Sequence, residues 1–218
     1  MCFSAQADIV GGVVVAAIGV DAVRHVDRRY DHLLVACLPL LFAAHQLDEA
    51  VVWWGLQGHV SAEAGRVALW AYLLFAFVWL PVFVPVAVIA LEERRSRRWM
   101  MAPFVAIGVV ASTALLAGML RGPVAATVGE YHLAYSTGLQ AGGLIVGLYV
   151  IATCGSLLVS GRRSVAAFGL VNLIAVAALA RLTVDGFASL WCGWAAITSA
   201  AIALHLRFGR SAAAPVLT

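Results

Sequence analysis

The chain has 218 residues, of which 63% are hydrophobic and 11% are charged. Soluble domains carry about 25% charged residues, so this composition excludes a water-soluble globule and predicts an integral membrane protein with one membrane domain. The formal net charge of +3 comes from arginines that lie between apolar segments. It therefore does not indicate a nucleic-acid partner, and the expected surroundings are a lipid bilayer.

Seven stretches of about 20 apolar residues are each long enough to cross a bilayer as a helix. They are separated by Arg, Gly and Pro and predict an all-α, polytopic membrane protein with a single domain over residues 1–218. The expected transmembrane helices are Ala7–Val23, Leu33–Leu56, Val67–Leu91, Trp99–Leu120, Thr137–Ser160, Val165–Leu182 and Gly186–Leu206.

The arginines are distributed unequally among the loops between these stretches. Alternate loops and the C-terminal end together hold eleven arginines, whereas the other set holds only Arg66, Arg121 and Arg181. Arginine-rich loops stay in the cytoplasm, so the N terminus is expected outside and the C terminus inside the cytoplasmic (inner) membrane.

Every basic side chain other than histidine is an arginine, and the chain contains no lysine. Retinal and pyridoxal phosphate are held as Schiff bases on a lysine amine. A retinal-binding photoreceptor, which also has seven helices, is therefore excluded. The four cysteines show no C-x-x-C spacing, so the sequence indicates neither a redox pair nor a zinc ribbon.

Residues 41–54 place polar and acidic side chains within an apolar helix. His45 and Glu49 are four residues apart and Asp48 is three from His45, so the three share one face. An ionisable residue at membrane depth costs about 2.5–3.5 kcal/mol and usually marks a functional cavity. Snorkelling of the two acids at the interface is the alternative. Because apolar residues continue to Gly58, we expect Glu49 to be a buried, protonated general acid hydrogen-bonded by His45.

The expected orientation brings further polar and aromatic residues to the outer side. The connection 121–136 contains His132 and Tyr135, and Asp185 begins the last span. Aromatic faces stabilise a desolvated cation by about 2 kcal/mol, so an acid among them suits carbocation chemistry. An interfacial aromatic belt is the alternative explanation of Trp53. The side chains expected to converge on one outward-facing pocket are His45, Gln46, Asp48, Glu49, Trp53, His132, Tyr135, Asp185, Trp191 and Trp194.

A metal site is a second interpretation of the same polar residues. His45, Glu49 and His132 form a His/His/carboxylate set of the kind that binds catalytic zinc or another non-haem metal, and Cys2 adds a fourth potential ligand. The sequence has no H-x-x-x-H spacing, so these ligands would come from separate segments of the chain.

Proline and glycine patterns concern the packing of the helices. Pro81 and Pro85 free backbone carbonyls and bend the third span, which is tolerated where neighbouring helices or a cavity satisfy those carbonyls. Small residues spaced four apart predict close helix packing in the fifth span. These are Gly138, Gly142, Gly143 and Gly147.

Two resemblances follow from these residues. The opening Met-Cys-Phe-Ser-Ala, the run His45-Gln46-Leu47-Asp48-Glu49 and the late Trp191-Cys192 pair resemble a bacterial seven-helix membrane family of unknown function. In size and helix count the chain is also similar to small membrane-bound terpene cyclases of fungal and actinobacterial meroterpenoid and indole-terpenoid pathways.

The second resemblance implies a mechanism. Those cyclases use acids on an early and a late helix to protonate a prenyl chain or its epoxide, and by position these are Glu49, with Asp48, and Asp185. The asparagine-x-x-tryptophan-glutamate run of the fungal enzymes is absent here. The likeness is therefore one of architecture.

The first expected function is thus a terpene cyclase that needs no cofactor and acts on a prenylated, lipid-soluble substrate. Glu49 or Asp48 donates the proton, His45 is the hydrogen-bond partner, and Asp185 or His132 is the counter-acid or final base. The expected substrate-binding residues are Trp53, Tyr135, Trp191, Trp194 and Gln46. The alternatives are a metal-dependent hydrolase or oxidoreductase, and a small-molecule receptor or carrier.

Overall fold

The structure is a computed structural model that describes residues 4–25, 30–129, 132–137, 142–182, 194 and 196–204. Helices dominate these residues, which confirms the predicted helical character. The elements are α1 (Ala5–His25), α2 (Tyr30–Gln57), α3 (Ala62–Leu73), the π-helix η1 (Leu74–Trp79), α4 (Leu80–Leu91), α5 (Arg95–Arg121), β1 (Ala125–Val128), β2 (Leu133–Ser136), α6 (Gly142–Val150), the π-helix η2 (Ile151–Gly155), α7 (Ser156–Leu158) and α8 (Arg163–Leu182). Residues 194 and 196–204 are also helical.

In the described chain, four helical segments are long and apolar enough to cross a membrane. They are Ala5–His25, Leu33–Gln57, Ala62–Leu91 and Arg95–Arg121, and they coincide with the first four expected spans. Two shorter apolar helices, Gly142–Leu158 and Arg163–Leu179, lie at the fifth and sixth expected spans. The last expected span is described only at residue 194 and residues 196–204.

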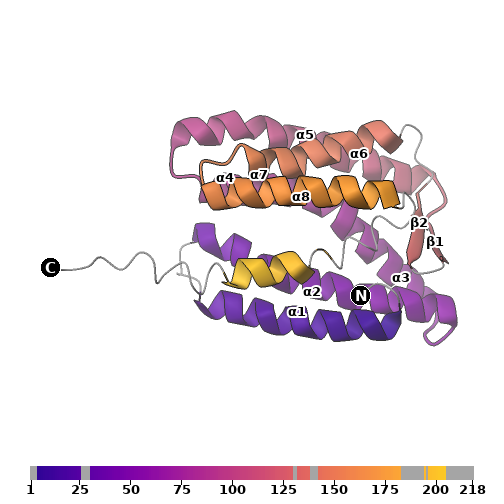
Figure 1. Cartoon of the computed structure of the whole chain (residues 1–218). Coiled ribbons are helices and arrows are strands. Elements are labelled where there is room, and N and C mark those ends of the chain that lie inside the picture. Colours follow the sequence, from indigo (N-terminus) through magenta and orange to yellow (C-terminus); the bar gives the residue numbers. More distant parts are fainter. Residues whose placement is uncertain are drawn as a thin grey trace.

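The helices form two layers, which Figure 1 shows one above the other. One layer holds α1, α2 and the short helix 196–204, which packs on α1 through Ala196 and Val15. The other holds α4 to α8. The continuous helix from α3 through η1 to α4 begins beside α2 and passes into the second layer, so it joins the two.

Glycine allows the closest helix approaches. A Cβ on Gly55 of α2 would lie 2.6 Å from the Cα of Gly65 in α3, so these helices cross at a pair of glycines. A Cβ on Gly108 of α5 would clash directly with the carbonyl oxygen of Pro81 in α4. Both contacts are backbone to backbone, so larger side chains would force the helices apart.

Among the described residues, the glycines of the fifth span do not pack in this way. A Cβ on Gly142, Gly143 or Gly147 would meet no other described atom within 4 Å. Their spacing places them on one face of α6, but that face looks away from the described helices. The fourth glycine of the pattern, Gly138, lies outside the described residues.

The third span contains the expected irregularity at its prolines. Pro81 lacks the N–H that would close a regular turn, and the six residues before α4 widen into η1. Neighbouring helices supply hydroxyl groups to the carbonyls of this segment. Ser112 donates to the Val78 oxygen at 2.7 Å, and Tyr149 donates to the Ala76 oxygen at 3.0 Å. The expectation that neighbours satisfy freed carbonyls is confirmed.

The turn between α2 and α3 is set by two residues. Gly58 has a φ of 77°, a left-handed conformation that suits glycine after a helix end. Ser61 caps α3, because its hydroxyl accepts a hydrogen bond from the Ala64 N–H at 3.2 Å. α2 and α3 therefore pack as antiparallel neighbours joined by a short connection.

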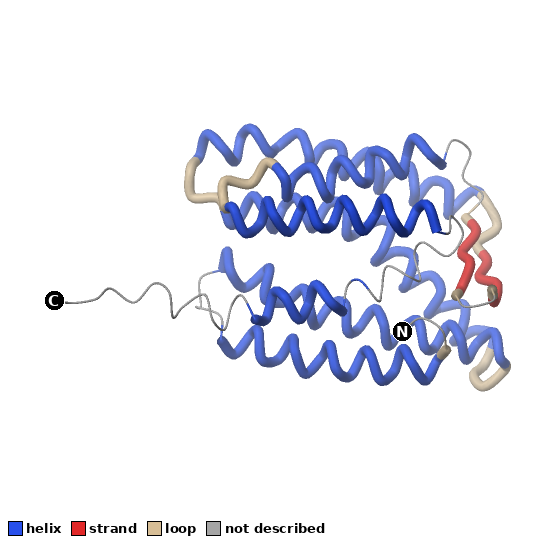
Figure 2. Tube along the Cα trace, viewed as in Figure 1, coloured by secondary structure: helices blue, strands red, loops and turns tan. Residues whose placement is uncertain are grey.

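A β-hairpin covers the end of the bundle where α2 ends and α3 begins (Figure 2). No strands are predicted in this connection from the sequence. β1 and β2 pair antiparallel with Ala126 opposite Tyr135, and the Gly129 N–H donates to the His132 carbonyl at 2.8 Å. An isolated hairpin is marginally stable, so this one depends on packing against the bundle. Leu133 is completely buried there, and Ala126 is also buried.

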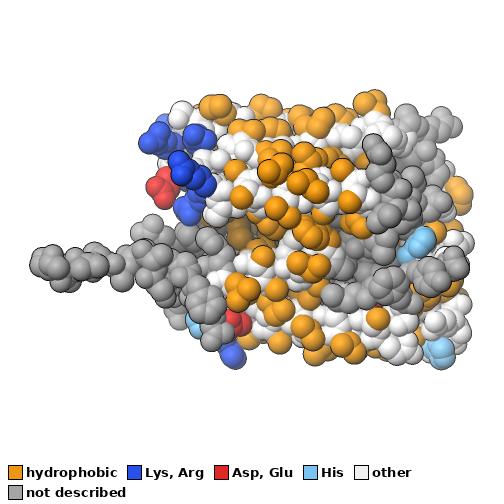
Figure 3. Space-filling view, in the orientation of Figure 1, with side chains coloured by type: hydrophobic (Ala, Val, Ile, Leu, Met, Phe, Trp, Pro, Cys, Tyr) orange, Lys and Arg blue, Asp and Glu red, His pale blue; other side chains and the backbone are white. Residues whose placement is uncertain are grey.

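Figure 3 shows that arginine side chains gather at the opposite end of the molecule, with an apolar band between the two ends. The described arginines at this basic end are Arg24, Arg94, Arg95, Arg97, Arg98, Arg162 and Arg163. Arg66 and Arg121 lie at the hairpin end, in the second turn of α3 and at the end of α5. The charge asymmetry read from the sequence is thus also an asymmetry in space.

Candidate functional site

Glu49 is fully buried in α2, beneath the hairpin. Its Oε1 accepts a hydrogen bond of 3.1 Å from the hydroxyl of Tyr135 on β2, although the two residues are 86 positions apart in the chain. Tyr135 also packs on the hydrophobic cluster that contains Trp53 and Leu133. The carboxyl group is therefore held away from water by a strand and two helices.

A continuous series of ring contacts begins at this hydrogen bond. We name it the aromatic series, and its members in order are Tyr135, Tyr72, His45, Phe75, Trp79 and Phe83. Successive ring centroids are 4.7, 4.0, 4.6, 5.3 and 3.9 Å apart. Four members come from the helix α3–η1–α4 at spacings of three and four residues, so one face of that helix carries them. The last two rings line an open groove on the surface.

His45 belongs to this series and is not the described partner of Glu49. Its ring stacks on Tyr72 with 16° between the ring planes, and its Nδ1 is buried without a hydrogen-bond partner among the described residues. The described hydrogen bonds of Glu49 include the one from Tyr135 and none from His45. The predicted pairing is therefore corrected: the histidine is held by stacking.

Two other predicted site residues in α2 are buried near the same end. Gln46 is 2% exposed and Trp53 is 4% exposed. Trp53 belongs to the core of the hairpin end together with Tyr72 and Leu133, which is a buried position and not one in an interfacial belt. Both residues thus lie on the inner side of α2, as the prediction of an inward-facing polar cluster requires.

Asp48 and His132 do not join Glu49. Asp48 lines an open groove with Ser61 and Glu63, between α2 and the beginning of α3. His132 lies in the loop of the hairpin, where its ring lies against Gly129. The two acids that the sequence places side by side therefore have different surroundings, because adjacent helix residues point about 100° apart.

Trp194 lies in a different part of the molecule from Tyr135. Its Nε1 donates a short hydrogen bond to the Oδ1 of Asn172 in α8. Both residues line a cavity that Tyr135 does not reach. Three further predicted site residues, Cys2, Asp185 and Trp191, lie outside the described residues. Of the ten side chains expected in one pocket, the structure brings together Glu49, Tyr135, His45, Gln46 and Trp53.

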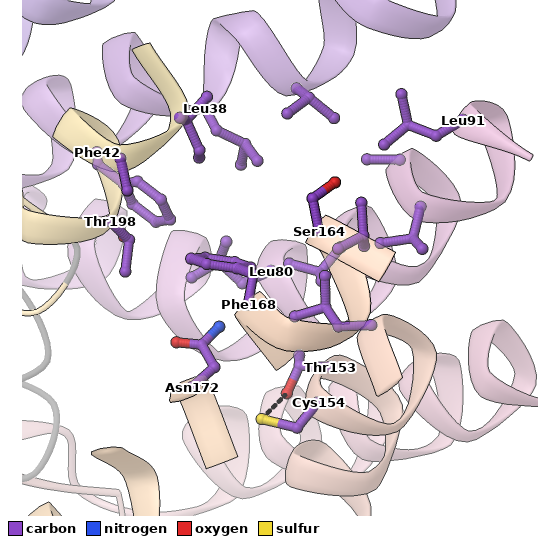
Figure 4. A pocket seen from close by; sticks show the side chains of 18 of the residues that line it. Leu38, Phe42, Leu80, Leu91, Thr153, Cys154, Ser164, Phe168, Asn172 and Thr198 are labelled. Atoms are coloured by element: carbon purple, nitrogen blue, oxygen red, sulfur yellow. Dashed lines mark hydrogen bonds between the residues drawn. The ribbon is translucent and has the colours of Figure 1, made fainter. Parts of the chain in front are cut away.

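The cavity lies between the two layers of helices and has a volume of about 300 Å³. Its walls come from α2, α4, the segment α6–η2–α7, α8 and the helix 196–204. Apolar side chains form most of the lining, including Leu38, Leu80 and Phe168 (Figure 4). Thr153, Cys154, Asn172 and Thr198 contribute polar atoms. Apart from Trp194, the residues that line this cavity are not among the predicted site residues.

Phe42 connects the cavity to the aromatic series. Its ring lines one end of the cavity and makes an edge-on contact with Phe75, with 6.3 Å between the centroids. Phe75 in turn contacts His45. Ring contacts therefore lead from the cavity to Tyr135, which binds the buried carboxyl of Glu49.

Sequence analysis missed several residues of these sites. Asp8 is fully buried in α1, and the signal that singled out Glu49, an acid within an apolar span, was also present there. Tyr72 is fully buried and makes two ring contacts, but a single tyrosine in an apolar helix carries no sequence signal. Arg162 lies by sequence among the arginines between two apolar stretches, yet it lines the cavity.

The proposed metal ligands do not come together in the described part of the chain. Among those residues, no three His, Cys, Asp or Glu side chains are placed to hold a metal ion. Stacking holds His45, and His132 lies in the hairpin loop. The fourth suggested ligand, Cys2, is outside the described residues.

Comparison with known proteins gives a family. No curated protein and no solved structure matches the chain. A model of a family of unknown function, DUF6629, matches residues 1–216. This match covers almost the whole sequence and agrees with the first resemblance drawn from the motifs. The chain therefore belongs to the DUF6629 family of unknown function.

Proposed function

We propose that this chain is a multi-pass protein of the cytoplasmic membrane that binds a lipid-soluble small molecule in the cavity between its two helical layers. The observation that carries the proposal is the cavity of about 300 Å³ with a mostly apolar lining. Ligand pockets of this size are concave, largely apolar and contain a few placed polar groups, and this lining has that composition. A molecule dissolved in the bilayer is the natural occupant.

The membrane arrangement of the proposal has seven spans with the N terminus outside. Four segments are long and apolar enough to cross, and the exposed arginines concentrate at one end. That end becomes the cytoplasmic side under the positive-inside rule, and the hairpin end becomes the outer side. Glu49 and the aromatic series then belong to the outer half, and the cavity extends from the middle toward the cytoplasm.

The reaction proposed for this site is cyclisation of a prenylated substrate that begins with protonation. Glu49 is the proton donor because it is the buried acid of the pair, whereas Asp48 lines an open groove. Aromatic rings next to the acid stabilise cationic intermediates and exclude water. Glu49 does not line the cavity, so the ligand or the rings of Phe42 and Phe75 must move for the proton to reach a ligand there.

A receptor or carrier is the second candidate, and one observation favours it. No acidic side chain is among the described residues that line the cavity. A ligand bound there would be stored or passed on without proton transfer. The two candidates share the binding step and differ only in whether the ligand is changed.

The binding step is tested with a cavity-filling variant in purified protein reconstituted in nanodiscs. Ala87 of α4 is 2% exposed and lines the cavity, so Ala87→Phe fills it. Ala106 of α5 is exposed and does not line the cavity, so Ala106→Phe adds the same volume on the surface of the bundle. We expect Ala87→Phe to weaken binding of radiolabelled hexadecanol by about tenfold or more, and Ala106→Phe to leave it unchanged. Equal affinities of both variants and the wild type would refute the proposal.

The reaction is tested by incubating a prenylated quinol and its epoxide with membranes that contain the protein. Cyclisation gives a product of the same mass with a different retention time in liquid chromatography. Under the cyclase proposal this product forms with the wild type and is lost with Glu49→Gln. Complete recovery of unchanged ligand that binds the cavity would favour the carrier.

A further inference from the structure

A single formal charge lines the described part of the cavity, and it is positive. The lining residues include Arg162, and none of the others is an Asp, Glu or Lys. Its Nε donates to the Leu91 carbonyl at 3.1 Å, which fixes the guanidinium near the end of α4. Figure 4 shows Leu91 and Ser164 at one end of the cavity, with Phe42 and Thr198 at the other. Ser164 is exposed, so the cavity reaches the surface at the arginine end.

The existing contacts of Arg162 leave its charge available. Its Nη2 is 3.3 Å from Oε1 of Glu93, whose side chain is 87% exposed. An ion pair so open to solvent is screened and contributes little. Further N–H donors of the guanidinium remain besides the two in these bonds. The arginine is thus anchored by a backbone carbonyl and only weakly neutralised.

The surroundings of Arg162 are also positive. The two connections at this end and the helix residues next to them, residues 91–98 and 159–163, carry six arginines against Glu92 and Glu93. Glu92 is buried, and its carboxylate already accepts hydrogen bonds within the protein. Its Oε1 accepts from Ser160 Oγ and from Gly161 N, each at 2.7 Å. It does not line the cavity. The summed field at this mouth therefore attracts anions.

We infer that the ligand of the cavity is an amphiphile with an anionic head and an apolar body. The head, a carboxylate or a phosphate, binds the guanidinium of Arg162 and the hydroxyl of Ser164. Arginine suits this role because its planar group donates to two oxygens of one anion at once. The apolar body extends along Val84, Val88 and Phe168. This inference rests on the proposed function and names the class of its ligand.

The same placement orients the ligand along the cavity. With its head at the arginine mouth, the far end of its apolar body lies at Phe42, where the contacts with the aromatic series begin. The atoms of the ligand nearest to Glu49 are then those farthest from the anionic head. A reaction started by this acid would occur at the tail end.

The test compares three ligands of one chain length in zwitterionic nanodiscs that contain the full protein. Radiolabelled palmitate and hexadecyl phosphate carry anionic heads, and hexadecanol is the neutral counterpart. We expect the wild type to bind at least one anionic ligand about tenfold more tightly than hexadecanol. Comparison of palmitate with hexadecyl phosphate shows whether the head is a carboxylate or a phosphate.

Matched variants locate the head. Arg162→Gln is expected to abolish the preference for the anionic ligand and to retain hexadecanol binding. Arg163→Gln removes the neighbouring exposed arginine, which does not line the cavity, and is expected to keep the preference. Arg162→Lys keeps the positive charge and is expected to keep part of the preference for the anionic ligand. Should Arg162→Gln fail to fold, the wild-type comparison still decides.

The outcomes separate this inference from the proposed function. Equal binding of hexadecanol and both anions by the wild type would overturn the anionic head, while loss of hexadecanol binding in Ala87→Phe would still support the cavity. A preference that persists in Arg162→Gln would also overturn the inference. Absence of binding by all three ligands would overturn the proposed function itself.

Discussion

At the scale of single residues, the hydrogen bond between Tyr135 and Glu49 joins the hairpin to the helical layers. The acceptor lies in a fully buried side chain, and the donor comes from a strand that packs on the same core. Breaking a hydrogen bond in such surroundings costs free energy, because the group that loses its partner cannot form a hydrogen bond with water instead. The carboxyl therefore has a structural role beside any chemical one.

Substitutions of Glu49 separate these two roles. Glu49→Gln keeps an amide oxygen that accepts from Tyr135, whereas Glu49→Ala removes the acceptor and leaves a void. We expect the alanine variant to lower the free energy of unfolding by about 1–3 kcal/mol more than the glutamine variant. Unfolding by sodium dodecyl sulfate in mixed micelles measures the difference.

The control for this comparison is Glu63→Ala, which removes an exposed acid from the first turn of α3. Its effect is expected to stay within about 0.5 kcal/mol. Equal losses for Glu49→Gln and Glu49→Ala would show that the hydrogen bond from Tyr135 contributes nothing to stability.

The sequence predicted the burial of Glu49 but not its partner. Spacing along a helix shows which residues share a face, and this placed His45 and Glu49 together. It does not show which distant segment faces them, and the donor proved to be a tyrosine 86 residues away. Asp48 illustrates the same limit: one position along the helix was enough to place it in an open groove.

At the scale of elements, the contact between α4 and α5 depends on the absence of a side chain at Gly108. Its missing Cβ makes room for the carbonyl of Pro81, which cannot move without the helix that carries it. Ser112, one turn further along α5, donates to the Val78 carbonyl in η1. The two contacts together hold α5 against the irregular part of the third span.

A pair of glycine substitutions tests this contact. Gly108→Ala is expected to destabilise the protein by about 1–3 kcal/mol, because the added methyl group forces two backbones apart. Gly143→Ala meets no described atom within 4 Å and is expected to be neutral or to stabilise α6 by up to about 1 kcal/mol. Thermal unfolding of both variants in detergent measures the effects, and the reverse order of stabilities would contradict the packing described here.

Glycine spacing did not indicate the close approaches at Gly55, Gly65 and Gly108, and the hairpin was not predicted. Small residues four apart define a smooth face, but only the neighbouring helices decide whether that face is covered. The strands are four residues each, too short for their alternation to stand out from a loop. By contrast, the first four spans were predicted closely, because length and hydropathy alone determine them.

At the scale of the whole molecule, charge distinguishes the two ends. The turn between α2 and α3 and the hairpin occupy one end, and the arginine-rich loops occupy the other. If these ends face opposite sides of a membrane, reagents that cannot cross will reach one and not the other. The proposed orientation is therefore open to direct measurement.

Variants that each add one cysteine at an exposed position provide this measurement. His59 lies in the turn after α2, and Ser96 lies near the beginning of α5 among the arginines. In intact spheroplasts, an impermeant maleimide is expected to label His59→Cys, but Ser96→Cys only after permeabilisation. The parent chain, which keeps its four native cysteines, gives the background. Labelling of Ser96→Cys in sealed spheroplasts would reverse the orientation.

The wide turns of η1 also determine which way the side chains of α4 point about the helix axis. An α-helix rotates by about 100° per residue, so a segment that takes one more residue per turn delays the rotation of the next segment. If these six residues closed into regular α-helical turns, Val84, Val88 and Leu91 would rotate by about 100° about the helix axis, away from the cavity. The cavity would lose a wall although every apolar side chain of that wall was still encoded. Its shape thus depends on the width of these turns as much as on the chemistry of the side chains.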